Sequence, residues 1–234
     1  VDLAEKQRNK KDQNCWQVNV EGSKNVFKAC LKFNRKLIFI STDFVFDGQN
    51  GPYKENDHRG GLTSKVSWYG MSKMVAEENC ETLLKDYLIL RISYPYRGKF
   101  PQKLDFARQI IKNFENDTLY PMFSDQIITP TFIDDIAPAI ELLLNKKLTG
   151  IYHIASPQTV SPYDFAKYLI ININKDSEKI KKTSIYDYLK NTDSTPRPPR
   201  SGLIVEKISK EGFVPTNWQK GIEKINTQSN GELI

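Results

Sequence analysis

The sequence contains 234 residues, of which 39% are hydrophobic and 26% charged, and its formal net charge is +6. This composition is too apolar for a disordered chain and suffices for one core, or for one core and a smaller lobe. No apolar run approaches the roughly 20 residues of a membrane-spanning helix, and no signal peptide is visible. The three cysteines (Cys15, Cys30, Cys80) have neither disulfide nor metal-site spacing. These features predict a cytoplasmic protein without a metal site.

The positive charge is spread along the chain and carries no nucleic-acid-binding signature. Neither a nucleic acid nor a membrane is therefore expected as a partner. A mildly positive cleft suits a small anionic ligand such as a nucleotide-bearing molecule.

The first half of the chain alternates between helical and strand patterns. Apolar spacing predicts an amphipathic helix within residues 12–33, and the apolar run 37–40 predicts a short buried strand. A long loop follows, then a helix over 68–85 and a second buried strand over 87–92. The apolar positions of the first helix are Val18, Val20, Val26, Phe27, Cys30 and Leu31. This order is typical of a doubly wound α/β sheet, in which ligands bind at the carboxyl ends of the strands.

The pattern is looser in the second half. Helices are predicted over 104–114 and 132–144, and a strand over 150–155. Ser161 is expected to cap a further helix, because it precedes a proline and stands three residues before an aspartate. The proline-rich stretch 195–200 is predicted to be an extended loop, in which an arginine contact to a ligand phosphate is one open role.

The strongest chemical signal is the pair Tyr69 and Lys73, four residues apart on one face of a predicted helix. A phenol has a pKa near 10, and a neighbouring ammonium lowers that pKa. Such a phenol can exchange a proton with the oxygen of a carbonyl/alcohol couple. Thr42, at the end of the first strand, can place a hydroxyl beside the phenol.

Motifs occur in a fixed order along the chain. They are Val1-Asp2-Leu3-Ala4-Glu5, Ser41-Thr42-Asp43-Phe44-Val45-Phe46-Asp47-Gly48, Tyr53-Lys54-Glu55-Asn56-Asp57, Tyr69-Gly70-Met71-Ser72-Lys73, Arg91-Ile92-Ser93-Tyr94-Pro95-Tyr96, Asp125-Gln126 with Pro130-Thr131, and Arg197-Pro198 with Leu203. This series resembles that of the dTDP-4-dehydrorhamnose reductase family. These extended short-chain dehydrogenases/reductases reduce a 4-keto-6-deoxy sugar nucleotide to dTDP-L-rhamnose with NADPH or NADH. The resemblance runs from the first residue to about Leu203.

The resemblance implies a role for each matching residue. Tyr69 would donate a proton to the C4 keto oxygen, with Lys73 and Thr42 completing the catalytic group. The implied cofactor-binding residues are Tyr69, Lys73, Ser41 and Ser93. The implied substrate-binding residues are Thr42, Asp43, Tyr94 and Val1. The nicotinamide would supply the hydride, and no catalytic role is expected for His153.

The implied fold is α/β, with a doubly wound, Rossmann-like parallel sheet and a smaller C-terminal substrate-binding lobe. Residues 1–95 would belong to the dinucleotide-binding domain, and 96–234 mainly to the lobe, with about 125–155 returning to the sheet. No G-x-x-G-x-x-G motif follows a strand in this sequence. We therefore expect the chain to lack roughly the first 60 residues of such a domain, about two βα units. The sheet would then miss its first strands and expose an edge.

Three departures from the family's pattern weaken the substrate assignment, and alternatives stay open. Phe44 replaces the family's tyrosine and Tyr94 its tryptophan, and the loop before Tyr69 is longer than is typical. One alternative is a non-catalytic regulatory subunit that binds a sugar nucleotide or NADP, resembling the methionine adenosyltransferase beta subunit. Another is an epimerase or dehydratase, although dehydratases carry T-D-E where this chain has Thr42-Asp43-Phe44. A homodimer is also left open.

Overall fold

Two strands flank a third in a parallel sheet at the centre of the larger part of the molecule. The computed structural model describes residues 1–98, 100, 102–191, 193–229 and 233. The order of this sheet is β1-β2-β4, and a second, two-stranded parallel sheet joins β3 and β5. The strands are β1 (Leu37–Thr42), β2 (Tyr87–Ile92), β3 (Met122–Phe123), β4 (Gly150–His153) and β5 (Lys182–Thr183).

Helices make up most of the remaining structure. The α-helices are α1 (Asp2–Glu5), α2 (Asn14–Trp16), α3 (Ser23–Lys32), α4 (Trp68–Leu83), α5 (Phe106–Glu115), α6 (Ile136–Asn145), α7 (Pro162–Asn172), α8 (Ile185–Lys190), α9 (Glu206–Lys210) and α10 (Trp218–Gln228). Gln17–Gly22 (η1) is a π-helix, and short 3-10 helices lie at η2 (Asp43–Val45), η3 (Thr63–Lys65), η4 (Ile133–Asp135) and η5 (Ser177–Lys179). No helix in the described ranges has the length and apolar character needed to cross a membrane.

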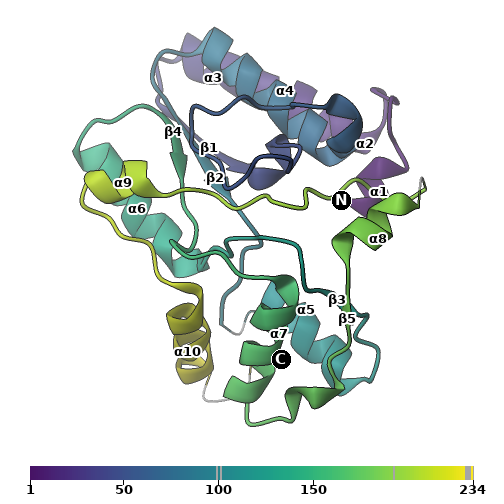
Figure 1. The fold of residues 1–234 in the computed structure, drawn as a ribbon. Coiled ribbons are helices and arrows are strands. Elements are labelled where there is room, and N and C mark those ends of the chain that lie inside the picture. Colours follow the sequence, from purple (N-terminus) through teal and green to yellow (C-terminus); the bar gives the residue numbers. More distant parts are fainter. Residues whose placement is uncertain (99, 101, 192, 230–232, 234) are drawn as a thin grey trace.

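The two pairings of the main sheet require crossover connections, because parallel strands cannot be joined by a hairpin. Leu37 pairs with Tyr87 at the start of β1 and β2, and Leu88 pairs with Gly150 where β4 joins. The chain passes through α4 between β1 and β2 (Figure 1). On the other side of β1 no strand pairs within the described residues.

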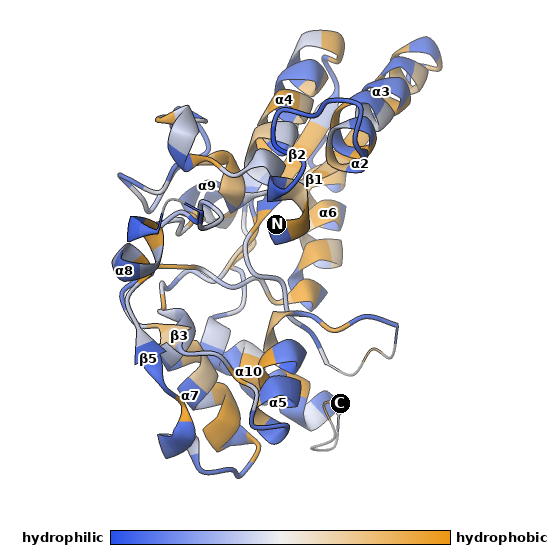
Figure 2. Cartoon of the chain, turned by 90° about the vertical axis from the view of Figure 1, so that its right-hand side faces the viewer, coloured by the Kyte–Doolittle hydropathy of each residue, from blue (hydrophilic) through white to orange (hydrophobic). Residues whose placement is uncertain are grey.

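Helices cover both faces of the main sheet, because successive strand residues point to opposite sides. On one face Ile89 packs with Phe27 of α3 and Cys80 of α4. On the other face Leu88 packs against α6 through Leu143. In Figure 2 the apolar residues gather on β1, β2 and α6, where helix and sheet pack together. The fold is therefore the predicted doubly wound α/β arrangement.

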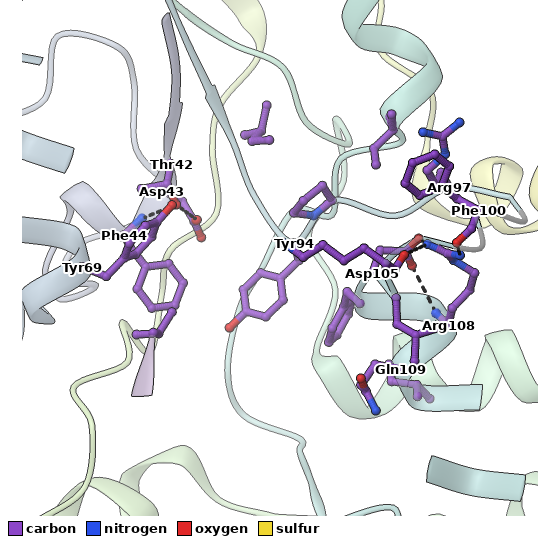
Figure 3. A pocket seen from close by; sticks show the side chains of 18 of the residues that line it. Thr42, Asp43, Phe44, Tyr69, Tyr94, Arg97, Phe100, Asp105, Arg108 and Gln109 are labelled. Atoms are coloured by element: carbon purple, nitrogen blue, oxygen red, sulfur yellow. Dashed lines mark hydrogen bonds and ion pairs between the residues drawn. The ribbon is translucent and has the colours of Figure 1, made fainter. Parts of the chain in front are cut away.

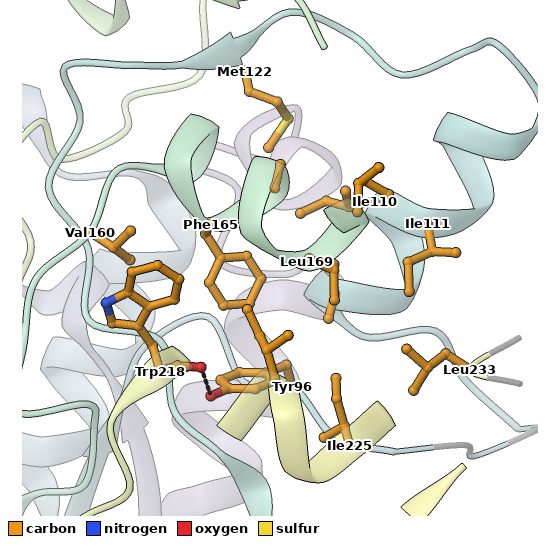
Figure 4. Close-up of a cluster of buried hydrophobic side chains, with 14 of the residues drawn as sticks. Tyr96, Ile110, Ile111, Met122, Val160, Phe165, Leu169, Trp218, Ile225 and Leu233 are labelled. Carbon is orange, nitrogen blue, oxygen red and sulfur yellow. Dashed lines mark hydrogen bonds between the residues drawn. The ribbon is translucent and has the colours of Figure 1, made fainter. Parts of the chain in front are cut away.

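A separate hydrophobic core holds α5, α7 and α10 together in the lower part of Figure 1. Phe165 lies at its centre, with rings of Tyr96 and Trp218 at centroid distances of 5.3 and 6.0 Å. The Tyr96 hydroxyl donates a hydrogen bond to the Trp218 carbonyl at 3.1 Å (Figure 4). Residues far apart in the sequence thus form a second lobe with its own core.

The structure corrects the expected continuous helix within 12–33. Three successive pieces, α2, η1 and α3, take its place, and only part of the expected apolar face is buried. Val20 and Phe27 are buried, whereas Val18, Val26 and Leu31 are exposed. The π-helical turn over Gln17–Gly22 adds a residue to the helical repeat. Apolar residues spaced for a regular α-helix therefore do not all face the core.

Helix boundaries follow capping residues. Ser161 accepts a hydrogen bond from Asp164 N at 3.0 Å, as predicted for the start of α7. Asp105 likewise accepts from Arg108 N at 3.1 Å, so α5 begins at Phe106 rather than at 104. The expected strand over 150–155 ends at His153. The strands β3 and β5 and the helices α8, α9 and α10 were not predicted.

Truncating Phe165 is expected to destabilise the second lobe. Phe165 is 0% exposed, so Phe165→Ala should lower the free energy of unfolding by about 3–5 kcal/mol through lost burial and a residual cavity. Phe33→Ala is the matched control, because Phe33 is 64% exposed at the end of α3 and should cost less than about 0.5 kcal/mol. Urea denaturation of both variants measures the difference. Equal losses would contradict the assignment of this core.

Candidate active site

The carboxyl ends of β1 and β2 meet at one edge of the main sheet. Thr42 pairs with Ile92 in the last register position, so the residues that follow each strand start out side by side. Asp43 follows β1, and Ser93 and Tyr94 follow β2. This edge is where ligands bind in doubly wound sheets.

A cavity of about 680 Å³ opens at this edge. In Figure 3, Thr42, Asp43, Phe44 and Tyr69 form one wall, and Tyr94 lies between this wall and α5. Of the eight residues predicted for the site, six line the cavity: Val1, Ser41, Thr42, Asp43, Tyr69 and Tyr94. Lys73 and Ser93 are not among the lining residues.

Three contacts fix the start of α4, whose second residue is Tyr69. Ser67 caps the helix by accepting from Gly70 N at 3.1 Å, and the Glu5 carboxylate accepts from Trp68 N at 2.7 Å. A Cβ atom at Gly70 would lie 2.1 Å from the Phe44 carbonyl oxygen, so only glycine permits this close approach. The Tyr-Gly sequence therefore brings the phenol directly against the segment that follows β1.

Asp43 is buried behind the cavity wall and is held by hydroxyl groups. The Thr42 hydroxyl donates to Asp43 Oδ1 at 3.1 Å, and the Ser93 hydroxyl donates to Oδ2 at 2.9 Å. Burial raises the pKa of Asp43 to about 6, although these hydrogen bonds oppose the shift. Ser93, predicted to bind the cofactor, thus contacts Asp43 in this structure, and its cofactor role stays a prediction.

The Tyr69 phenol keeps its proton at neutral pH. Burial raises the pKa of Tyr69 to about 12, and a hydrogen bond with the Thr42 side chain opposes that rise. Thr42 and Tyr69 line the same cavity, and the assistance of the phenol by the Thr42 hydroxyl stays a prediction.

The expected lowering of the Tyr69 pKa by Lys73 is wrong for this structure. The Lys73 ammonium donates to the Ile40 carbonyl at 2.7 Å and lies 3.9 Å from the centre of the Phe39 ring. Burial lowers the pKa of Lys73 to about 8, and the negative charge of Glu77 opposes this change. The ammonium thus contacts the β1 backbone and an aromatic ring of the same strand in this structure.

A buried ion pair that sequence reasoning missed anchors α4 to β2. Glu77 and Arg91 are both 0% exposed, and Arg91 donates to Glu77 from Nε at 3.0 Å and from Nη2 at 2.7 Å. Arg59, from the loop before α4, donates to the same carboxylate at 2.9 Å. Glu77 stands two helical turns from Tyr69, so the pair fixes the rotation of the helix that presents the phenol. The spacing of Tyr69, Lys73 and Glu77 by four residues was the signal available in the sequence.

Two aromatic residues shape the middle of the cavity. The ring of Phe44 lies 6.1 Å from that of Tyr69 and 6.4 Å from that of Tyr94, centre to centre. Tyr94 has a φ angle of 40°, which non-glycine residues rarely adopt. Its hydroxyl accepts from Gln126 Nε2 at 3.3 Å. The strained backbone thus turns the Tyr94 ring toward the cavity at the end of β2, and strain of this kind is often found at functional sites.

The far wall of the cavity carries basic side chains that the sequence analysis did not single out, apart from Arg197. Arg108 is fixed by Asp105 at 2.8 Å, and Arg97 lies over the Phe100 ring at 4.6 Å. Arg197 donates to both carboxylate oxygens of Asp2, at 2.8 and 3.0 Å. Arg108 and Arg197 are thus already paired with carboxylates, and the other wall of the cavity holds the phenol and hydroxyl groups.

His153 is a buried strand residue with satisfied nitrogens. Its Nδ1 lies 3.0 Å from the Ile204 carbonyl, and its Nε2 lies 3.4 Å from Arg91 Nη1. Burial holds the pKa of His153 well below its ordinary value, and the Arg91 charge adds to this effect. Within the described residues no group of three or more His, Cys, Asp or Glu side chains could hold a metal ion.

Both the fold and this site define an α/β protein of the Rossmann-like type, with a cavity at the ends of parallel strands. The family model described as RmlD substrate binding domain matches residues 1–230, and the chain belongs to that family. The resemblance drawn from the motifs is thereby confirmed.

Relatives and solved structures agree with this assignment. The chain is 29% identical to the dTDP-4-dehydrorhamnose reductase of Aggregatibacter actinomycetemcomitans over 221 residues, covering 90% of this chain and 72% of that protein. It is 31% identical to a probable low-salt glycan biosynthesis reductase of Haloferax volcanii, covering 76% of this chain and 59% of that protein. The crystal structure of dTDP-4-dehydrorhamnose reductase from Bacillus anthracis, in complex with NADP, superimposes with a TM-score of 0.83 at 27% identity, covering 98% of this chain and 77% of that one.

Neutralising Glu77 is expected to destabilise the protein strongly. Glu77→Gln leaves the buried Arg91 guanidinium without its carboxylate, whereas Arg59 keeps its ion pair with Glu81, and the free energy of unfolding should fall by about 3–5 kcal/mol. Glu115→Gln is the control, because it breaks a half-exposed pair with Lys175 and should cost at most about 1 kcal/mol. Chemical denaturation at one pH compares the two. Similar losses would show that the buried pair does not anchor α4.

Proposed function

We propose that this protein is an NAD(P)H-dependent reductase that acts on the C4 keto group of a dTDP-4-keto-6-deoxy sugar. The observation that carries the proposal is the shared cavity of Thr42 and Tyr69 at the ends of β1 and β2. Relatives named dTDP-4-dehydrorhamnose reductase, and a similar structure that holds NADP, support the same substrate class and cofactor.

Tyr69 is the proposed proton donor. Its pKa of about 12 keeps the phenol protonated at neutral pH, so the proton is available when negative charge develops on the substrate oxygen. Thr42 lines the same cavity and is the proposed partner of the phenol at the substrate oxygen. NADPH or NADH would supply the hydride to the carbon atom.

Lys73 is the proposed contact for the nicotinamide ribose. An ammonium has three donor hydrogens, and in the described structure one of them is given to the Ile40 carbonyl. The remaining donors lie at the same end of the sheet as Tyr69 and fit ribose hydroxyl groups. Ser41, which lines the cavity, and Ser93, behind it, are proposed as further cofactor contacts.

The two lobes would divide the ligands between them. We assign residues 1–95 to the cofactor side, and 96–234 mainly to substrate binding, with about 125–155 returning to the sheet. Val1, Asp43 and Tyr94 are the proposed sugar contacts, and the basic side chains near α5 face the phosphate-bearing part of the substrate. The contact between β2 and β4 supports the return of the chain to the sheet.

Removing the phenol oxygen tests the assignment. With the full-length protein, Tyr69→Phe should lower kcat for NADPH oxidation with a dTDP-4-keto-6-deoxyhexose by about 10²–10⁴-fold, because only the proton donor is lost. Binding of NADPH, followed by fluorescence, should change little. Tyr168→Phe is the matched control, because its hydroxyl contacts Glu223 on the surface of the second lobe.

The outcomes separate reduction from the regulatory alternative. Wild-type turnover that survives Tyr69→Phe would contradict the proton-donor role. A wild-type protein that binds NADPH but never oxidises it with this substrate would favour a non-catalytic binding subunit instead.

A further inference from the structure

Gln126 is a buried amide behind the cavity, and the proposed function gives it no role. It is 1% exposed and is not among the residues that line the cavity. Its Nε2 atom lies 3.0 Å from the Pro198 carbonyl oxygen and 3.3 Å from the Tyr94 hydroxyl oxygen. One amide group therefore joins the proline-rich stretch 195–200 to a ring that lines the cavity.

Backbone hydrogen bonds hold the chain at Gln126 independently of the amide. Ile127 N donates to the Pro199 carbonyl at 2.8 Å, and Ser201 N donates to the Ile127 carbonyl at 3.0 Å. The two segments are thus paired through main-chain atoms of the residue next to Gln126. A change of the Gln126 side chain therefore alters the amide contacts and leaves this pairing in place.

The Pro198 carbonyl fixes which end of the amide faces Tyr94. A carbonyl oxygen only accepts hydrogen bonds, so the NH2 group of Gln126, and not its oxygen, must lie against it. The same nitrogen contacts Tyr94, so its second hydrogen points at the Tyr94 oxygen, which accepts it. The phenol also carries one hydrogen of its own. Within the described residues no atom accepts that hydrogen, which leaves it for a ligand.

Neighbouring rings keep the Tyr94 hydroxyl at the cavity. The Tyr94 ring packs edge-on against Phe106 of α5 at 4.9 Å and lies 6.4 Å from the Phe44 ring, centre to centre. In Figure 3 the side chain leaves the end of β2 and enters the space between the Phe44 wall and α5. Burial raises the pKa of the Tyr94 phenol, so the hydroxyl keeps its hydrogen at neutral pH. Tyr94 therefore presents a hydrogen-bond donor in a fixed position.

We propose that Gln126 is a positioning residue that turns the hydrogen of the Tyr94 hydroxyl into the cavity, where Tyr94 donates a hydrogen bond to an oxygen atom of the sugar. This inference rests on the proposed function, in which the sugar is the group that Tyr69 protonates. No proton is transferred in the contact. Its consequence is specificity, because a donor fixed before binding favours sugars with an acceptor oxygen at this place over sugars without one.

The position of Phe44 favours the sugar as the group beside Tyr94. The Phe44 ring lies 6.1 Å from that of Tyr69 and 6.4 Å from that of Tyr94, so a single ring separates the proposed proton donor from this hydroxyl. A sugar whose C4 oxygen meets Tyr69 therefore carries its other oxygens toward Tyr94. Hydroxyl oxygens of a sugar accept hydrogen bonds, as the polarity of the Tyr94 hydroxyl requires.

Removing the Tyr94 hydroxyl tests the contact. With the full-length protein, Tyr94→Phe should weaken binding of dTDP-L-rhamnose, the product of the proposed reaction, by about three- to tenfold, which corresponds to one neutral hydrogen bond. The loss should be larger for dTDP-L-rhamnose than for dTDP, which has no sugar at this place. Isothermal titration calorimetry measures both dissociation constants. Tyr168→Phe is the matched control, because its hydroxyl contacts Glu223 on the surface of the second lobe.

Reversing the polarity at position 126 tests the positioning role. In Gln126→Glu the new carboxyl group has at most one hydrogen, which the Pro198 carbonyl takes, so an oxygen that only accepts faces Tyr94. The Tyr94 hydroxyl then donates inside the protein, and dTDP-L-rhamnose should bind about as weakly as to Tyr94→Phe. Gln126→Leu neither donates nor accepts and leaves the hydroxyl free to turn, so its loss should be smaller. Gln17→Glu is the matched control, because this exposed amide also donates to a backbone carbonyl, that of Lys11 at 2.8 Å.

A double variant distinguishes positioning from a structural role. In the Tyr94→Phe background, Gln126→Glu and Gln126→Leu should weaken binding little further, because the hydroxyl through which Gln126 acts is absent. A purely structural role would give the same loss in both backgrounds. Thermal denaturation confirms that each variant is folded, and Gln126→Leu carries the comparison if Gln126→Glu does not fold.

Each outcome decides between the hypotheses. Equal losses for dTDP and dTDP-L-rhamnose in Tyr94→Phe, or a loss in the Gln126 variants that persists in the Tyr94→Phe background, would overturn this inference and leave the reductase function standing. A wild-type protein that binds the sugar nucleotide but never reduces its 4-keto form would overturn the reductase function, and the binding measurements would still decide the role of Gln126. A wild-type protein that binds no sugar nucleotide would overturn both.

Discussion

The buried ion pair between Glu77 and Arg91 is the constraint on which the site depends. Two buried charged groups remain ionised only when they pair with each other, as Glu77 and Arg91 do here. The guanidinium of Arg59 donates a further hydrogen bond to the Glu77 carboxylate. The pair joins the middle of α4 to β2 and ties the loop before α4 to the same point. Because Tyr69 lies two turns away on the same helix face, satisfying these charges also aims the phenol at the cavity.

The cavity exists because two separate cores hold its walls. The main sheet, with helices on both faces, fixes the ends of β1 and β2, and the core around Phe165 fixes α5 across from them. The strained backbone of Tyr94 marks the place where the chain leaves the sheet for the second lobe. A ligand between these walls meets hydroxyl and phenol groups on one side and basic side chains on the other.

Burial acts on two acids in the same wall with different results. It raises the pKa of both Tyr69 and Asp43, which keeps the phenol protonated throughout the physiological range but leaves the carboxyl able to titrate near pH 6. The Thr42 hydroxyl donates to the Asp43 carboxylate, and Thr42 and Tyr69 line the same cavity. One wall of the cavity therefore holds two acids with different pKa values. Lys73, held at the β1 backbone, belongs to the cofactor side of the proposed site.

The sequence by itself determined the features that depend on residues close together along the chain. Alternation of apolar runs and loops predicted β1, β2 and α4, a capping serine predicted the start of α7, and ordered motifs predicted the family and six of the cavity residues. The tertiary structure alone decided the rest. The pairing of β3 with β5, the Glu77–Arg91 contact and the basic far wall join residues that are distant along the chain, and no periodicity records such contacts. The direction of the Tyr69 pKa shift was also beyond the sequence, because burial and the competing carbonyl for Lys73 exist only once the chain is folded.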